Sequence, residues 1–132
     1  MEKQKRPTEL PGKTIRLRTG CGSMYVTVTF KDGVPFEVFG VLGKAGQCAL
    51  CYAQGLTRCV TTGLRYGVPI QEFIKQLSNI ACPSPGLDEG RKILSCPDAI
   101  AQAITMILEV EHEGNDSGRT SQSEQTHLPK AG

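Results

Sequence analysis

The stretch Met24-Tyr25-Val26-Thr27-Val28-Thr29-Phe30 decides the fold, because two kinds of side chain alternate along it without interruption. The residues at even positions are apolar, and those between them are tyrosine or threonine. A period of two is the pattern of a β-strand that is buried on one face only. We therefore predict a strand over residues 24–30, with one face on the core and the other toward solvent.

The flanking segments predict two further strands. In residues 15–18 apolar side chains alternate with arginines, and Gly20-Cys21-Gly22 then interrupts the pattern. On the other side, Asp32-Gly33 supplies residues that tolerate positive φ, and residues 36–42 are rich in aromatic and β-branched side chains. Residues 13–42 are therefore predicted to form a three-stranded antiparallel meander.

Beyond Gly43 the apolar residues recur every three or four positions, which predicts helices. A long helix is expected first, with a buried face formed by Ala49, Ala53, Leu56, Val60 and Leu64. A short helix should follow Pro69, and the prolines and glycines of residues 78–94 indicate a loop. Ser95 or Cys96 can cap a last helix, which should end near Val110. Strands followed by helices predict an α+β fold, with the helices packed on the sheet.

Length and composition fit one domain between two polar ends. The chain has 132 residues and a formal net charge of +2. We expect a basic flexible arm over residues 1–12, a domain over 13–110 and a disordered tail over 111–132, because the tail is almost devoid of apolar residues. No window resembles a membrane span or signal peptide, so we expect a cytoplasmic protein without membrane partners.

The six cysteines carry most of the chemical information, because a reducing compartment favours free thiols or metal sites over disulfides. Cys21 lies between two glycines, Cys82 and Cys96 each precede a proline, and Cys48 begins the long helix. These four thiols suggest one tetrahedral Cys₄ site, for which zinc is the expected metal. The spacing is not that of a zinc ribbon, and the alternative is that these cysteines are small buried apolar residues.

The sequence carries partial signals of two other functions. Cys48-Ala49-Leu50-Cys51 is a CxxC at a helix N-terminus, where the first thiol becomes more acidic and could serve thiol redox chemistry, but the βαβ pattern of thioredoxin-like proteins is missing. Cys51 could also replace Cys48 as a ligand, one turn away. The N-terminal arm is basic, yet aromatic and basic residues are not interleaved along the sequence, so nucleic-acid binding is not expected.

Short motifs in one order give the chain a family resemblance. They are Thr19-Gly20-Cys21-Gly22, Tyr25-Val26-Thr27-Val28, Pro35-Phe36-Glu37-Val38-Phe39, Leu42-Gly43-Lys44, Gly46 through Cys48, Ile74-Lys75-Gln76-Leu77 with Cys82-Pro83, and Ser95-Cys96-Pro97-Asp98-Ala99-Ile100-Ala101. Over residues 13–109 the chain resembles the TSCPD domain found at the C-terminal end of adenosylcobalamin-dependent, or class II, ribonucleotide reductases. Leu94 stands where the motif has its threonine.

The resemblance implies a metal site at Cys21, Cys48, Cys82 and Cys96, while Cys51 and Cys59 are additional to the family pattern. It also implies a stand-alone accessory module of ribonucleotide reductase and deoxyribonucleotide synthesis, docking on the reductase or another protein. The chain is too short to hold the catalytic barrel, so we expect neither catalysis by the chain alone, nor catalytic residues, nor a cobalamin site. The alternative is a split-off subunit of an adenosylcobalamin-dependent ribonucleoside-diphosphate reductase.

Overall fold

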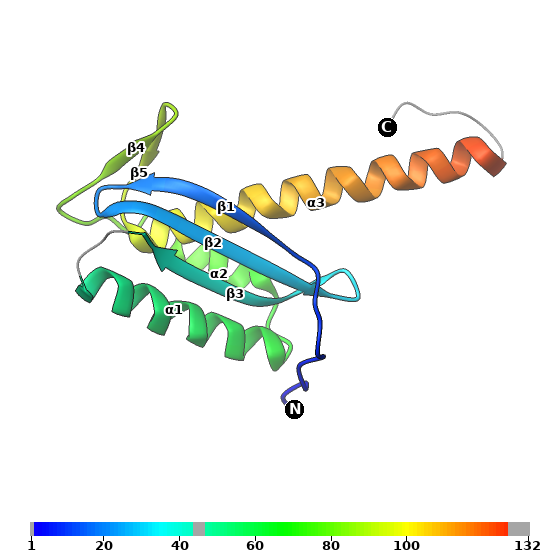
Figure 1. The fold of residues 1–132 in the computed structure, drawn as a ribbon, viewed down its shortest axis with the longest axis horizontal. Coiled ribbons are helices and arrows are strands. Elements are labelled where there is room, and N and C mark those ends of the chain that lie inside the picture. The colour runs from blue at the N-terminus through cyan, green and yellow to red at the C-terminus, as the bar shows by residue number, and fades with distance from the viewer. Residues whose placement is uncertain (1, 44–46, 127–132) are drawn as a thin grey trace.

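The protein is an α+β domain in which a meander precedes the helices, as the sequence predicts (Figure 1). The computed structural model describes residues 2–43 and 47–126. The elements in chain order are β1 (Gly12–Thr19), β2 (Gly22–Lys31), β3 (Val34–Leu42), α1 (Gln47–Arg65), α2 (Ile70–Leu77), β4 (Gly86–Asp88), β5 (Arg91–Ile93) and α3 (Cys96–Thr126).

The large sheet has the order β1-β2-β3, and both pairs are antiparallel. Its register places Leu17 beside Met24 and Met24 beside Leu42, so one row of apolar side chains crosses all three strands. The even-numbered side chains of residues 24–30 are all buried, which is the face that the alternation predicted. A bulge between Thr29 and Phe30 shifts the register near the β2–β3 turn.

The helices cover one face of this sheet. α1 packs along β3, α3 packs on β1 and β2, and α2 packs on α3. Gly40 permits the close approach, because a Cβ there would lie 3.2 Å from Thr57 Cγ2 and 3.8 Å from Ile100 Cδ1. Within residues 2–43 and 47–126, no helix packs on the other face of the sheet (Figure 1). The side chains of Tyr25 and Phe39 on that face are exposed.

The outer edge of β3 is closed by a side chain from α1. The Thr61 hydroxyl accepts a hydrogen bond from the Val38 amide at 2.9 Å and donates one to the Val38 carbonyl at 3.0 Å. Both backbone groups that would otherwise face a further strand are thereby satisfied. The edge is therefore protected against strand addition at its centre.

A small hairpin replaces the loop predicted for residues 78–94. β4 and β5 pair antiparallel, with Asp88 opposite Arg91. The two turn residues have positive φ, 47° for Glu89 and 82° for Gly90, as a two-residue hairpin turn requires. Strands of three residues are too short for alternation to reveal, so the prolines and glycines around them pointed to irregular structure instead.

The last helix continues well past the predicted end near Val110. α3 reaches Thr126, which includes most of the segment expected to be a disordered tail, while residues 127–132 lie outside the described part. No proline occurs between residues 98 and 128, and extending a helix already anchored by packing costs little per residue. The polar composition predicted no tertiary packing, but it does not by itself end a helix.

The N-terminal arm lies against the domain at two points. The Gln4 amide donates a hydrogen bond to the Arg65 carbonyl at 2.9 Å, and the Arg65 guanidinium donates to the Gln4 carbonyl. Further along, Arg6 Nε lies 2.8 Å from a carboxylate oxygen of the buried Glu37 on β3. The arm therefore crosses the end of the sheet from β1 to β3.

Candidate metal site

Two glycines bring the loop after α2 onto the turn between β1 and β2. A Cβ on Gly20 would lie 1.7 Å from the Ser84 carbonyl oxygen, and one on Gly86 would lie 2.6 Å from the Gly20 nitrogen. Backbone atoms never approach a real Cβ so closely, so both positions require glycine. This contact brings the segment containing Cys82 against the turn that carries Cys21.

The turn itself is held by a threonine. The Thr19 hydroxyl accepts a hydrogen bond from the Cys21 amide at 3.0 Å and donates one to the Gly22 carbonyl at 2.8 Å. Gly22 has φ of 125°, in the region that favours glycine. Thr19 is buried, whereas Cys21 is exposed at the tip of the turn. The thiol therefore projects from a fixed backbone.

Ser95 and Asp98 position Cys96 at the start of α3. Ser95 is the cap, because its hydroxyl accepts the Asp98 amide at 3.1 Å while donating to the Ile80 carbonyl. The buried Asp98 carboxylate accepts the amides of Asn79 at 2.9 Å and Leu94 at 3.0 Å. These bonds tie the segment after α2 to the one before α3.

Cys82 is placed by the same connection. Its amide donates a hydrogen bond to the Leu94 carbonyl at 3.0 Å, two residues before Cys96. Its sulfur accepts the Ser84 amide at 3.4 Å. The backbone thus brings Cys82 close to Cys96.

The three thiols of Cys21, Cys82 and Cys96 are neighbours. The pKa of the Cys96 thiol is raised from 9.0 to about 11, mainly by burial and then by charge repulsion from the adjacent Cys21 thiol and a hydrogen bond with it. A hydrogen bond with Thr19 lowers this pKa, and the charge of Cys82 raises it. Mutual repulsion between thiolates is what a bound cation would remove.

The remaining cysteines lie on α1. Cys48 is exposed on its first turn, Cys51 is exposed about one turn further on, and Cys59 is exposed about three turns beyond Cys48. The start of α1 lies at the same end of the molecule as the β1–β2 turn and the start of α3 (Figure 1). Among the side chains that the structure describes, in residues 2–43 and 48–111, no three His, Cys, Asp or Glu side chains converge closely enough to hold a metal ion.

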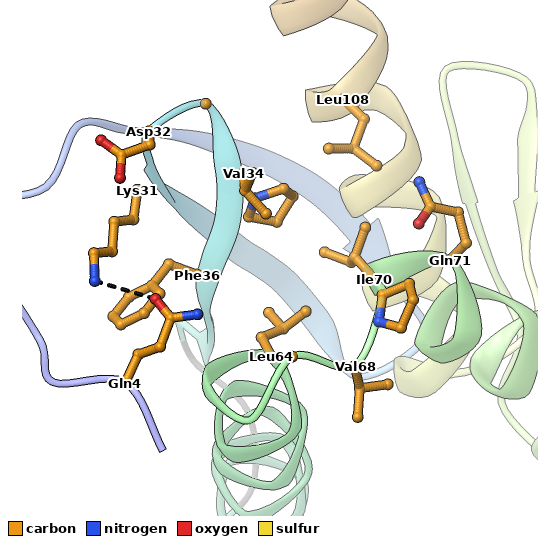
Figure 2. A pocket seen from close by; sticks show the side chains of 14 residues that line it. Gln4, Lys31, Asp32, Val34, Phe36, Leu64, Val68, Ile70, Gln71 and Leu108 are labelled. Carbon is orange, nitrogen blue, oxygen red and sulfur yellow. Dashed lines mark hydrogen bonds between the residues drawn. The ribbon is translucent and has the colours of Figure 1, made fainter. Parts of the chain in front are cut away.

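A pocket of about 500 Å³ lies away from the cysteines, between the β2–β3 turn and the connection from α1 to α2 (Figure 2). Figure 2 shows Leu64, Ile70 and Leu108 directed toward it, and a hydrogen bond from Lys31 Nζ to Gln4 Oε1 at 3.1 Å on one side. The Phe36 ring lies between the cations of Lys31 and Arg65, each 5.4 Å from its centre. The charged side chains in its lining are Lys31 and Asp32, at the β2–β3 turn.

The structure assigns a structural part to residues that sequence reasoning treated only as motif members. Asp98 belongs to the motif that begins at Ser95, and its buried carboxylate also accepts a hydrogen bond from Gln102 at 2.7 Å. The signal available was its position three residues after a serine cap. Nothing in the sequence indicated that its partners would include the distant Asn79.

The chain belongs to the TSCPD domain family, whose sequence profile matches residues 2–108. It is similar to a vitamin B12-dependent ribonucleotide reductase of Agrobacterium fabrum strain C58, with 25% identity over 114 residues. That match covers 86% of this chain but 9% of the relative. No solved structure matches the chain. In the described part, no helix is long and apolar enough to cross a membrane.

Proposed function

We propose that this chain is a zinc-stabilised accessory module associated with ribonucleotide reduction. The observation that carries the zinc site is that Cys21 and Cys82 flank Cys96 closely enough to influence its ionisation. The three thiols come from the β1–β2 turn, the loop after α2 and the start of α3. Cys48 would be the fourth ligand, with Cys51 as its substitute one turn along α1.

The donor set suits zinc better than harder cations. Thiolates are soft ligands, whereas magnesium and calcium prefer oxygen. Zinc supplies structural cross-linking when four protein thiolates fill its coordination sphere, leaving no open position for a substrate. Here the cross-link would join the sheet to the first turn of α3, in a chain with 5% aromatic residues and no tryptophan in its core.

The association with ribonucleotide reduction is supported by the family and by the reductase relative. Because the chain spans about 9% of that relative's length, reductase activity would reside in a partner, and this chain would dock on it or act as its split-off subunit in the cytoplasm.

Metal analysis of the purified full chain tests the site. We expect about one zinc per chain, lost in Cys96→Ser together with a lower melting temperature, because the metal stabilises only the folded state. Cys59→Ser is the matched control and should keep its zinc, because Cys59 lies further along α1. Full zinc content in Cys96→Ser would contradict the site.

The purified wild-type chain and its zinc-free variant also test whether the module docks on a reductase. The wild-type chain should co-elute with a class II reductase from which the homologous segment has been removed, and the zinc-free variant should bind it less. Failure of the zinc-loaded chain to bind would refute the association while leaving the metal site intact. If a double variant, Cys48→Ser with Cys51→Ser, kept its zinc, neither thiol would be a ligand. Both would then be available in the wild-type chain for thiol exchange, which a thiol–disulfide assay measures.

A further inference from the structure

We propose that the open face of the β1-β2-β3 sheet binds single-stranded nucleic acid. This inference is independent of the zinc site, which lies at one end of the sheet. It rests on features of one face of the sheet: two exposed aromatic rings, two arginines, and a carboxylate whose charge is neutralised by an ion pair. These residues are Tyr25, Phe39, Arg16, Arg18 and Glu37. Rings stack on bases while cations contact phosphates, which is how sequence-tolerant single-strand sites are built.

The strand register interleaves the basic and aromatic residues that are separate in the sequence. Arg16 on β1 pairs with Tyr25 on β2, and Tyr25 pairs with Val41 on β3. One step along the face, Thr14 pairs with Thr27, and Thr27 pairs with Phe39. Tyr25 and Phe39 therefore lie diagonally across adjacent strands, close enough for neighbouring bases to stack on both.

Both rings are available to a ligand. Tyr25 is 43% exposed and Phe39 is 45% exposed. Tyr25 extends toward Gly43, where an added Cβ would lie 3.7 Å from the ring, so no side chain covers it on that side. The helices pack on the opposite face of the sheet, and the rings therefore have no cover among the elements that the structure describes.

The charge of this face suits a polyanion. Arg16 and Arg18 point to the open face, and neither forms an ion pair within residues 2–43 and 47–111. Glu37 is the carboxylate of this face, but it is buried and paired with Arg6. At the edge of β1, the Asp88 carboxylate is engaged by the Arg18 amide and by Arg91.

The N-terminal arm extends the basic surface. It crosses the sheet at the Glu37 end, held there by Arg6, and the preceding Lys3 and Lys5 are exposed. Arg18 lies at the other end of the face, where it pairs with Ser23. Cationic side chains therefore flank the pair of aromatic rings on both sides. A single-stranded nucleic acid lying along β2 would need this arrangement, because its phosphates extend beyond the stacked bases in both directions.

Fluorescence anisotropy with labelled oligothymidylate and oligouridylate of about twelve nucleotides tests the proposal on the full chain. We expect saturable binding at low ionic strength. Tyr25→Leu should weaken it about tenfold, because leucine keeps apolar area but cannot stack as a ring. Arg16→Gln should make the dependence on log salt shallower by about 0.7, whereas Tyr25→Leu should leave that slope unchanged. Binding of either oligonucleotide supports the site, and a preference identifies DNA or RNA.

Matched controls lie on α1, away from the open face. Tyr52 is 76% exposed and Arg58 is exposed, so Tyr52→Leu and Arg58→Gln remove the same groups elsewhere. Both variants should leave the affinity for the oligonucleotide and its salt dependence unchanged. Tyr25→Phe keeps an aromatic ring at position 25 and should keep full affinity, so it distinguishes loss of the ring from loss of folding. The proposal is overturned if neither oligonucleotide binds, as for a face that docks protein, or if the controls weaken binding as much as Tyr25→Leu.

Discussion

Asp98 shows how a motif residue without reactive chemistry can determine the position of reactive ones. Its two carboxylate oxygens accept hydrogen bonds from Asn79, Leu94 and Gln102, and it is 3% exposed. Cys96 lies two residues earlier in the same turn, and Cys82 bonds to the Leu94 carbonyl. The carboxylate thus fixes the two backbone segments that carry these thiols.

Replacing this carboxylate should destabilise the domain strongly. Asp98→Ala leaves the amides of Asn79 and Leu94 without their acceptor, and each unsatisfied buried donor costs about 1–3 kcal/mol. We expect the free energy of unfolding in urea to fall by about 2–4 kcal/mol. Glu109→Ala, an exposed carboxylate on the same helix, is the control and should change it by no more than about 0.5 kcal/mol. Equal effects would mean that the Asp98 hydrogen bonds contribute little.

The sequence could predict turns at the cysteines and group them as one site, but not the backbone contacts that bring the turns together. Glycine and proline beside Cys21, Cys82 and Cys96 indicated bends, and family resemblance grouped these positions with Cys48. Their proximity depends on backbone contacts between residues more than sixty positions apart, such as Gly20 with Ser84. Whether they hold zinc stays a prediction, and the same is true of Cys48 and Cys51.

At the level of elements, long periodic segments were predictable and short ones were not. The three strands of the meander, α1 and α2 follow clear apolar periods, and the structure confirms them. β4 and β5 have three residues each, so the one local signal was the Glu89-Gly90 pair that forms their turn. The open face was also missed, because the pairing of Arg16 with Tyr25 arises from strand register rather than from sequence proximity.

Substituting Gly20 tests how the segment that leads into the β4–β5 hairpin is attached to the sheet. Gly20→Ala would place a Cβ 1.7 Å from the Ser84 carbonyl oxygen, and backbone cannot yield cheaply there. We expect a loss of about 1–3 kcal/mol in the free energy of unfolding, with reduced zinc binding if Cys82 moves away from Cys21. Urea unfolding and metal analysis provide the measurements.

Gly55→Ala is the comparison within α1. An added Cβ there meets no atom within 4 Å, and alanine is favoured over glycine in a helix interior by about 0.5–1 kcal/mol. This variant should therefore be more stable than the wild type, with unchanged zinc. A stable Gly20→Ala protein that bound zinc normally would show that the loop and the turn can separate without consequence.

On the scale of the whole molecule, the chain is a sheet with helices on one face, an open face opposite and the thiol cluster at one end. The apolar core joins β2 to α1 and α3 through aliphatic side chains such as Val28, Val60 and Ile104. The thiols of Cys21, Cys82 and Cys96 lie where the sheet, the β4–β5 hairpin and α3 meet. A metal bound by them would therefore link the ends of elements whose middle parts are already joined by the apolar core. Metal binding and folding should then be coupled, and the coupling should depend on pH.

The sign of that pH dependence follows from Cys96. In the metal-free chain, folding raises the pKa of this thiol from 9.0 to about 11, so the folded state holds the proton more tightly than the unfolded state. The resulting stability is fully present below pH 9 and is lost as the pH rises through about 11. We expect the melting temperature of chelator-treated protein to fall over this window, and to fall less in Cys96→Ser, which lacks the thiol. With zinc bound, the ligating thiols of the folded state are already deprotonated, so the stability of the wild-type protein should rise as the pH approaches the unfolded-state pKa of 9.0 and level off above it. A metal-free melting curve that is independent of pH, or one unaffected by Cys96→Ser, would show that this thiol does not couple protonation to folding.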